Sequence, residues 1–237
     1  MEIDSFLDLV KKRRSIRQFK PDPIPDEYVE KILEAARWAM SGANGQPWEF
    51  VVVRDAETKA KIAKLGVEHL KRNYPLELSR VEELRHAAYS RPPEDVPDLR
   101  EAPVIIVVCG DIRTLQATVL AAHFYGEGMS TFHMNLANAT QNIHLAAAAL
   151  GLGSRWMSTS QPLEEGLRGL LGIPTEFRIY AIVPIGYRTA EPAPSYRREL
   201  SEIVHQEKYD ESKYRSDEDI REFLIRLKQR RAPLYQR

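Results

Sequence analysis

Three stretches of the chain are continuously apolar and show no helical period. They are residues 48–55 (WEFVVVRD), 103–111 (PVIIVVCGD) and 177–187 (FRIYAIVPIGY). Each is short for a helix and rich in β-branched and aromatic residues, and this composition predicts a strand. Because such strands have no polar face to turn toward water, we expect them to lie inside a sheet that is covered on both faces.

Residues 26–40 (DEYVEKILEAARWAM) instead repeat their apolar positions at helical spacing. The stretch begins with Asp26, which can cap the first turn of a helix, and its inward face carries Val29, Ile32, Leu33, Ala36, Ala39 and Met40. We therefore expect a helix here, with one face packed inward.

Residues 131–150 (TFHMNLANATQNIHLAAAAL) predict a second helix, which carries little charge on any side and ends at Gly151. A helix of this kind is buried nearly all round, which in a chain of this size indicates the centre of the molecule or of a dimer. Its two histidines, His133 and His144, need polar partners there.

The C-terminal part differs in composition from the rest. Residues 188–198 are rich in proline and predict a connector that leaves the core. We expect a domain of residues 1–204 and a charged extension of residues 205–237. In this extension the stretch DEDIREFLIRLKQR predicts an amphipathic helix that packs on a second subunit, and its apolar face carries Ile220, Phe223, Leu224 and Leu227.

Charge and composition exclude several classes of function. Lysine plus arginine equals aspartate plus glutamate at 34 each, so no net field draws the chain to nucleic acid or an anionic membrane. No apolar run approaches the roughly 20 residues that cross a bilayer, and the N-terminus has no signal-peptide order, so we expect a cytoplasmic protein. Cys109 lies in an apolar run and is expected to be a buried, inert thiol. The six histidines lack metal-ligand spacing, so no metal is expected.

Residues 11–20 (KKRRSIRQFK) form a local exception to this neutrality, since six of the ten are basic and none is acidic. A solvated helix end or a targeting patch would explain the charge alone. However, Arg13, Ser15 and Arg17 alternate as on one side of an extended segment, which leaves Ile16 and Phe19 for the core. Two guanidinium groups and a hydroxyl on one side suit a phosphate and an attached polyol.

Two loops carry further candidate groups. In residues 40–50 (MSGANGQPWEF) a flexible backbone is combined with side-chain donors and acceptors, which suits the edge of a flat heterocycle, although an ordinary turn closed by proline is the alternative. In residues 151–162 (GLGSRWMSTSQP) the backbone amides near Ser158 and Thr159 stand at the end of a short predicted strand. Ser158 lacks the glycine pattern of a nucleophile elbow, which argues against a hydrolase.

Four motifs occur in one order along the chain: RRSIRQF, SGANGQPWEFVVV, NATQNIHLAAAALGLGSRW and VPIGY. Together they resemble the FMN-dependent nitroreductase family, over about residues 10–204. The resemblance implies an α+β sandwich with a central, mostly antiparallel sheet flanked by helices. It also implies a homodimer of interlocked chains with two equivalent FMN sites in the interface.

The same resemblance implies a role for each matched residue. Arg13, Ser15 and Arg17 correspond to binders of the FMN phosphate and ribityl chain, with Arg14 contributing its backbone. A backbone amide at Ser158 or Thr159 is directed at flavin N5. The remaining positions are a loop that reaches the flavin from the other subunit, at Ser41, Gly42 and Asn44, and a late arginine that grips the phosphate, at Arg197 or its substitute Arg198.

The implied function is that of a flavoprotein oxidoreductase. Hydride passes from NADH or NADPH, as co-substrate, through flavin N5 to a small organic acceptor such as a nitroaromatic, a quinone or an enone. A specialised enzyme of the same fold, a reductive dehalogenase or a flavin-consuming enzyme, is the first alternative. A non-catalytic dimer that holds nucleic acid or phosphorylated partners through residues 11–20 is the second, and the neutral total charge disfavours it.

Overall fold

The computed structural model describes residues 2–85, 93–117, 125–192 and 195–231. The chain divides into two compact units. The first contains Met1–His69 and Asp95–Pro192, and the second contains Leu70–Glu94 and Ala193–Arg237. The expected division into residues 1–204 and 205–237 stays a prediction.

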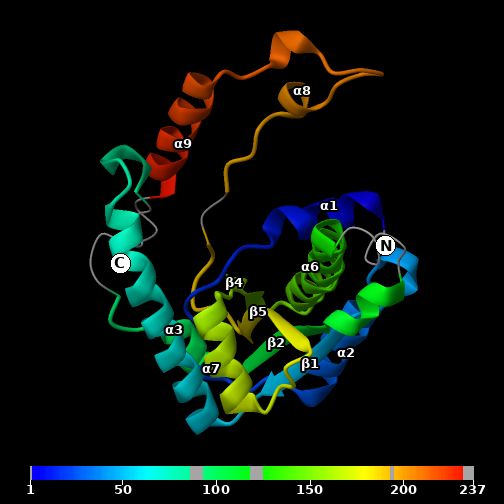
Figure 1. The fold of residues 1–237 in the computed structure, drawn as a ribbon, viewed down its shortest axis with the longest axis vertical. Coiled ribbons are helices and arrows are strands. Elements are labelled where there is room, and N and C mark those ends of the chain that lie inside the picture. Colours follow the sequence, from blue (N-terminus) through cyan, green and yellow to red (C-terminus); the bar gives the residue numbers. More distant parts are fainter. Residues whose placement is uncertain (1, 86–92, 118–124, 193–194, 232–237) are drawn as a thin grey trace. The chain divides into compact units, whose positions relative to one another are not determined.

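A five-stranded sheet forms the centre of the first unit (Figure 1). Its order is β1 (Trp48–Val53), β2 (Val104–Asp111), β5 (Phe177–Gly186) and β3 (Gly153–Ser154), and β4 (Met157–Ser158) also pairs with β5. Every one of these pairings is antiparallel. The three apolar stretches are therefore strands, and the prediction of an α+β fold with a mostly antiparallel sheet is confirmed.

Burial differs between the central strands and the edge. Strand β2 is buried along nearly its whole length, and β5 is buried from Ala181 onward. Strand β1 is only half covered, because Glu49 is exposed and Val52 is 37% exposed. The expectation of two covered faces was wrong for β1. As the edge strand it has one neighbour, and the layers that cover the central strands do not extend fully over it.

Helix α6 (Tyr125–Ala149) contacts β1, β2, β3 and β5 on one face of the sheet, and α2 (Asp26–Arg37) packs beside it (Figure 1). The face of α6 toward the sheet is apolar and buried, at Phe132, Leu136, Ala139, Ile143 and Ala147. The opposite face is not covered within one chain, since Met134 is 55% exposed. Within one chain this helix is therefore not buried all round, and its place at the centre of a dimer stays a prediction.

The ends of both helices have local causes. Gly151 takes a positive φ of 75°, and Leu152 donates its amide to the carbonyl of Ala147 at 2.9 Å, so α6 ends at glycine as expected. Asp26 does not cap α2, because Pro25 is the capping residue and the Asp26 carboxylate pairs with Arg54 at 2.6 Å instead.

The remaining elements of the first unit frame the sheet. They are α1 (Ile3–Lys12), η1 (Gly42–Asn44), α3 (Ala56–Leu78), α4 (Pro97–Glu101), η4 (Ile112–Ala117) and α7 (Gln161–Leu171). Helix α7 packs on β5 and buries Leu163 and Leu167. It also meets the first part of α3 closely, because a Cβ atom at Gly166 would lie 2.7 Å from the Leu65 side chain.

The second unit contains the end of α3 with η2 (Glu82–Leu84), α8 (Leu200–Ile203), η5 (Glu211–Lys213) and α9 (Asp217–Arg231). Helix α9 packs against η2, where Lys228 donates to the Glu82 carbonyl at 2.6 Å and Arg221 pairs with Glu83 at 3.9 Å. The predicted helix in the charged extension is therefore present. Its packing on a second subunit stays a prediction.

Candidate functional site

The basic segment follows the C-terminal end of α1 in an extended conformation. Ile16 donates its amide to the Ser154 carbonyl at 3.0 Å, and Lys20 donates to the Tyr187 carbonyl at 2.8 Å, so the segment runs beside β3 and the end of β5. Ile16 and Phe19 are buried, as expected, although Phe19 has the same parity as Arg13, Ser15 and Arg17 and is therefore not placed inward by alternation alone. Their burial attaches this basic segment firmly to the sheet.

The polar side chains of this segment remain toward the surface. Ser15 and Arg17 are exposed, and Arg13 and Arg14 are partly buried. The Arg14 guanidinium donates back to the carbonyls of Lys11 and Arg13 at the end of α1, where a cation is favoured by the helix dipole. This contact holds the Arg14 side chain at the end of α1, and a backbone contribution of Arg14 to a cofactor stays a prediction.

A glycine allows the segment to approach β3 so closely. A Cβ atom at Gly153 would lie 2.5 Å from Cγ1 and 2.9 Å from Cβ of Ile16. No residue with a side chain fits at that separation without displacing Ile16. The Gly153–Ser154 pair thus positions the segment that carries Arg13, Ser15 and Arg17.

The second candidate group, the loop of residues 40–46, has an unusual backbone. Ala43, Asn44 and Gln46 have positive φ angles of 51°, 54° and 42°. Residues other than glycine adopt this region rarely and at an energetic cost, so such strain favours a functional role for a loop. The Ser41 hydroxyl accepts a hydrogen bond from the Gln46 amide at 3.1 Å, which closes the loop.

Amide side chains of α6 hold this loop in place. Asn135 accepts a hydrogen bond from the Gly42 amide at 3.1 Å, and Asn138 donates to the Met40 carbonyl at 3.1 Å. Asn142 donates to the carbonyl of Ala35 in α2 at 2.9 Å. The sequence patterns did not predict that these asparagines hold the loop and α2. The available signal was three asparagines at i, i+3 and i+7 on an otherwise apolar helix.

The third group lies at the end of β4, where Ser158 pairs with Ala181 of β5. The Thr159 hydroxyl donates to the Ile179 carbonyl at 2.6 Å, which fixes the chain immediately after the strand. Ser160 is bonded to His69, with 2.8 Å between its hydroxyl and Nδ1. The backbone at Ser158 and Thr159 is therefore held in a definite direction.

A row of aromatic rings lies beside this strand. His144 stacks on Trp156 with ring centroids 6.2 Å apart, Trp156 contacts Tyr180 at 5.3 Å, and Tyr180 stacks on His133 at 5.9 Å. Trp156 is 38% exposed, and His133 is exposed rather than buried as expected. These rings come from three separate parts of the chain. Trp156 and His133 expose part of their surface, and an exposed aromatic face suits a planar ligand.

His144 connects the aromatic row to the basic segment. It is buried, and its Nδ1 lies 2.7 Å from the hydroxyl of Ser154, the residue that pairs with Ser15. Burial and, secondarily, the Arg13 charge lower the pKa of His144 to about 4, so the ring is neutral near pH 7. Its Nε2 atom is buried without a hydrogen-bond partner in the described part of the chain.

The polar groups of the basic segment and the His144 ring are suited to bind a phosphate and not a cation. Arg13, Arg17 and the Ser15 hydroxyl offer donors and positive charge, and the unpaired His144 Nε2 is a buried polar atom of the kind that a ligand can satisfy. Within one chain the loop and the segment are nevertheless connected to different points of α6, the loop through Asn135 and the segment through Ser154 and His144. Asn135 and His144 are nine residues apart on α6, a distance of about 13 Å along the helix axis.

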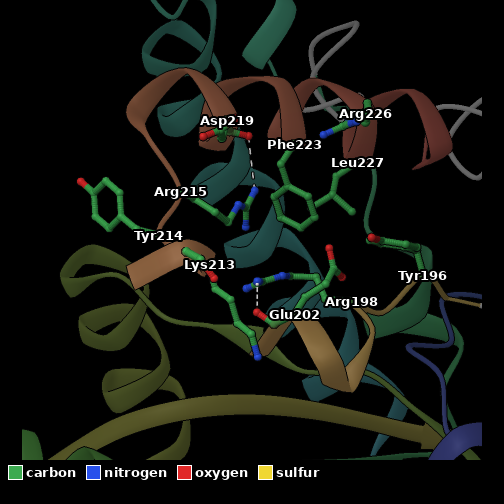
Figure 2. A pocket seen from close by; sticks show the side chains of 11 residues that line it. Tyr196, Arg198, Glu202, Lys213, Tyr214, Arg215, Asp219, Phe223, Arg226 and Leu227 are labelled. Carbon is green, nitrogen blue, oxygen red and sulfur yellow. Dashed lines mark hydrogen bonds between the residues drawn. The ribbon is translucent and has the colours of Figure 1, made fainter. Parts of the chain in front are cut away.

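Arg197 and Arg198 belong to the second unit. Arg197 is exposed and donates to the Tyr196 carbonyl at 2.8 Å, whereas Arg198 donates to the Glu202 carbonyl at 2.8 Å. Arg198 also lines a cavity of about 440 Å³, shown in Figure 2, in which Arg215 stacks on Phe223 at 4.3 Å. The other charged groups in its lining are Glu202, Lys213, Asp219 and Arg226.

Other kinds of site find no support in the described ranges. Cys109 is buried, as expected, and desolvation raises the pKa of its thiol to about 12, which disfavours the reactive thiolate. In those ranges no three His, Cys, Asp or Glu residues gather in a way that could hold a metal ion, and His86 and His123 lie outside them. None of the helices described combines the length and apolar character that a bilayer span requires.

Comparison with known proteins gives consistent matches. The sequence profile of the nitroreductase family matches residues 10–187. The NADH dehydrogenase of Thermus thermophilus is 32% identical over 216 residues, which are 81% of this chain and 91% of that protein. Iodotyrosine deiodinase 1 of Rattus norvegicus is 31% identical over 212 residues, which are 86% and 70% of the two chains. A crystal structure of oxidized iodotyrosine deiodinase bound to FMN and 3-iodo-L-tyrosine matches with a TM-score of 0.69 at 27% identity, and the match covers 86% of this chain and 100% of that one.

Proposed function

Because the chain belongs to the nitroreductase family of oxidoreductases, we propose that it binds FMN and passes hydride from NADH or NADPH to a small organic acceptor. The proposed acceptors are nitroaromatics, quinones and enones. The observation that carries this proposal is the extended segment with Arg13, Ser15 and Arg17, which is attached to β3 beside a buried histidine with an unpaired nitrogen.

Bound FMN supplies a ring nitrogen, N5, that accepts and releases hydride. The residues of this chain bind and orient it. Arg13 and Arg17 hold the phosphate by charge-assisted hydrogen bonds, Ser15 contacts the phosphate and ribityl end, and Arg14 adds its backbone amide. A backbone amide at Ser158 or Thr159 donates toward N5, and the Thr159 contact to Ile179 keeps that strand end in place.

The site is completed by a second copy of the chain. Ser41, Gly42 and Asn44 of the partner reach the flavin edge, because within one chain this loop is anchored on α6 at Asn135, about 13 Å along the helix axis from His144. An uncovered apolar face supports the homodimer: α1 exposes 66% of Ile3, 37% of Phe6, 42% of Leu7 and 39% of Val10 at i, i+3, i+4 and i+7. A phosphate contact of Arg197, or of its substitute Arg198, stays a prediction.

Solution mass and cofactor content test the assembly together. We expect light scattering to give the mass of a dimer. The protein should contain one FMN per chain, with flavin absorbance at about 450 nm. Leu7→Glu places a charge in the exposed face of α1 and should shift the protein toward monomer and lower FMN content. A monomeric wild-type protein that retains one FMN per chain would contradict the shared site.

Anaerobic mixing tests the reaction itself. NADH or NADPH should bleach the flavin absorbance, and addition of a nitroaromatic, quinone or enone should restore it. If neither nicotinamide bleaches the flavin, the hydride transfer step is wrong. This assay also ranks the two co-substrates by their rates.

Arg13→Ala tests the phosphate contact. Loss of one charge-assisted hydrogen bond weakens FMN binding by about 1.5 to 3 kcal/mol, which is roughly 10- to 150-fold in Kd. Arg37→Ala is the matched control, because Arg37 lies on α2 and pairs with Glu34 at 2.6 Å. Equal FMN affinities for the two variants would remove Arg13 from the site. The same titration tests Arg17, Arg197 and Arg198.

Reductive dehalogenation is a second candidate function. The Rattus norvegicus relative and the protein in the FMN-bound structure are both iodotyrosine deiodinases. In that reaction two electrons and a proton convert an aryl iodide into the parent arene and iodide. Reduced protein is mixed anaerobically with 3-iodo-L-tyrosine, and iodide and tyrosine are quantified. Faster iodide release than nitroaromatic reduction would favour the deiodinase. Loss of FMN itself during turnover would instead indicate a flavin-consuming enzyme.

A further inference from the structure

His144 is buried deep in the first unit, yet only one of its two nitrogens is used. The ring is 3% exposed, and Nδ1 lies 2.7 Å from the Ser154 hydroxyl. Nε2 is fully buried and finds no hydrogen-bond partner in the described ranges. Buried polar atoms are seldom left in this state, because an unmade hydrogen bond costs about 1 to 3 kcal/mol. A ligand or a bound water that pairs with Nε2 would remove this cost.

The surroundings of the ring define which ligand fits. Burial and the nearby Arg13 charge lower the pKa of His144 to about 4, so near pH 7 the ring is neutral and has one N–H donor and one acceptor. The Arg13 guanidinium is close enough to act on the ring, and it repels a second positive charge. A neutral N–H donor beside a guanidinium is suited to an anion that both groups contact.

The backbone places this ring directly behind the phosphate segment. The Ser154 side chain holds His144, while the Ser154 carbonyl accepts the Ile16 amide at 3.0 Å and its backbone pairs with Ser15. His144 and the Arg13 to Arg17 segment are therefore attached to the same residue of β3. An anion held by Arg13 and Ser15 is therefore a candidate partner for Nε2.

We propose that His144 Nε2 donates a hydrogen bond to the phosphate end of the FMN held by Arg13 and Ser15, so that α6 contributes a buried neutral ligand to the cofactor. This inference rests on the proposed function. It also fixes the tautomer: phosphate oxygens accept, so the proton lies on Nε2, and the Ser154 hydroxyl donates to Nδ1.

The test compares FMN with riboflavin, which lacks the phosphate. His144→Leu removes the donor, and His144→Gln places an amide N–H close to the position of Nε2. We expect His144→Leu to weaken FMN binding by about tenfold or more and riboflavin binding by less than about twofold. His144→Gln should recover most of the FMN affinity. His205→Leu is the control, because His205 lies in the second unit and accepts the Asp210 amide at 3.0 Å.

Each outcome decides between the proposal and its rivals. Equal losses for FMN and riboflavin in His144→Leu, or no loss for either, would overturn the phosphate contact and assign Nε2 to a buried water. Failure of the wild-type protein to bind FMN would refute the proposed function instead. If His144→Leu does not fold, nitrogen-15 NMR of the wild-type histidines replaces it. The His144 Nε2–H signal should move on addition of FMN and not of riboflavin, and equal movement with both would overturn the proposal.

Discussion

Gly153→Ala should disturb the cofactor segment through packing alone. The new Cβ atom would lie 2.5 Å from Cγ1, 2.9 Å from Cβ and 3.0 Å from Cγ2 of Ile16, whereas apolar carbons rest at about 3.5 to 4.0 Å. A rotamer change of Ile16 cannot relieve the clash, because its own Cβ is among the atoms that are too close. The backbone at Ile16 must therefore move by about half an ångström or more.

Two contributions give the magnitude of this effect. Overpacking of a closely packed core typically destabilises by about 1 to 3 kcal/mol. Displacement of Ile16 also weakens its amide bond to the Ser154 carbonyl, now 3.0 Å long, which contributes about 1 kcal/mol. We expect the free energy of unfolding to fall by about 2 to 4 kcal/mol. FMN binding should weaken as well, because Arg13, Ser15 and Arg17 move with Ile16.

The assay is urea unfolding of the flavin-free protein, followed by circular dichroism, together with FMN titration. Gly169→Ala is the control, since Gly169 is exposed in α7, has no atom within 4 Å of the new Cβ, and should gain about 0.5 to 1 kcal/mol from helix propensity. Ile16→Ala combined with Gly153→Ala should lose less stability than the sum of the single variants. Equal stabilities of the two glycine variants, or strict additivity in the double variant, would refute the steric argument.

Three further predictions concern buried polar groups. Glu164 is buried and accepts hydrogen bonds from Arg168 at 2.9 Å and from the Ile179 amide at 3.1 Å. Because Glu164→Ala leaves these donors without their partner, it should lower the free energy of unfolding in urea by about 3 to 5 kcal/mol, and Glu164→Gln should lower it by less. A cost below about 1 kcal/mol for the alanine variant would show that the network is dispensable. Cys109, whose pKa is raised to about 12 by burial, should resist alkylation by iodoacetamide in the native protein and react once urea unfolds it. His144 has a pKa of about 4 in the folded state, below its ordinary value of 6.5. The unfolded chain therefore binds a proton at this residue more readily, so the contribution of His144 to the free energy of unfolding is complete above about pH 6.5 and is lost as pH falls toward 4. Relative to His144→Gln, the wild-type free energy of unfolding should fall by about 3 kcal/mol over this range, and parallel pH profiles would contradict the shift.

Local patterns in the sequence determined most of the elements. The three apolar stretches and the amphipathic stretch of the tail form the expected structures. The helix expected at residues 26–40 is present but ends at Arg37, and Met40, expected on its inward face, is 76% exposed. The signals of these elements are local, because side-chain direction repeats every two residues in a strand and every 3.6 in a helix. The alternation around Arg13 agrees with the burial of Ile16, but the burial of Phe19 breaks that period and follows from its contacts with the sheet.

Tertiary structure alone decided how these elements use their polar groups. The edge position of β1 left Val52 exposed, although its sequence resembles that of the buried strands. Asn135 contacts a loop that lies 93 positions away in the chain. His144 pairs with Ser154, and its Nε2 has no partner among the residues that the structure describes. Such contacts depend on which distant segments the fold brings together, and hydrophobic periodicity carries no information about that choice.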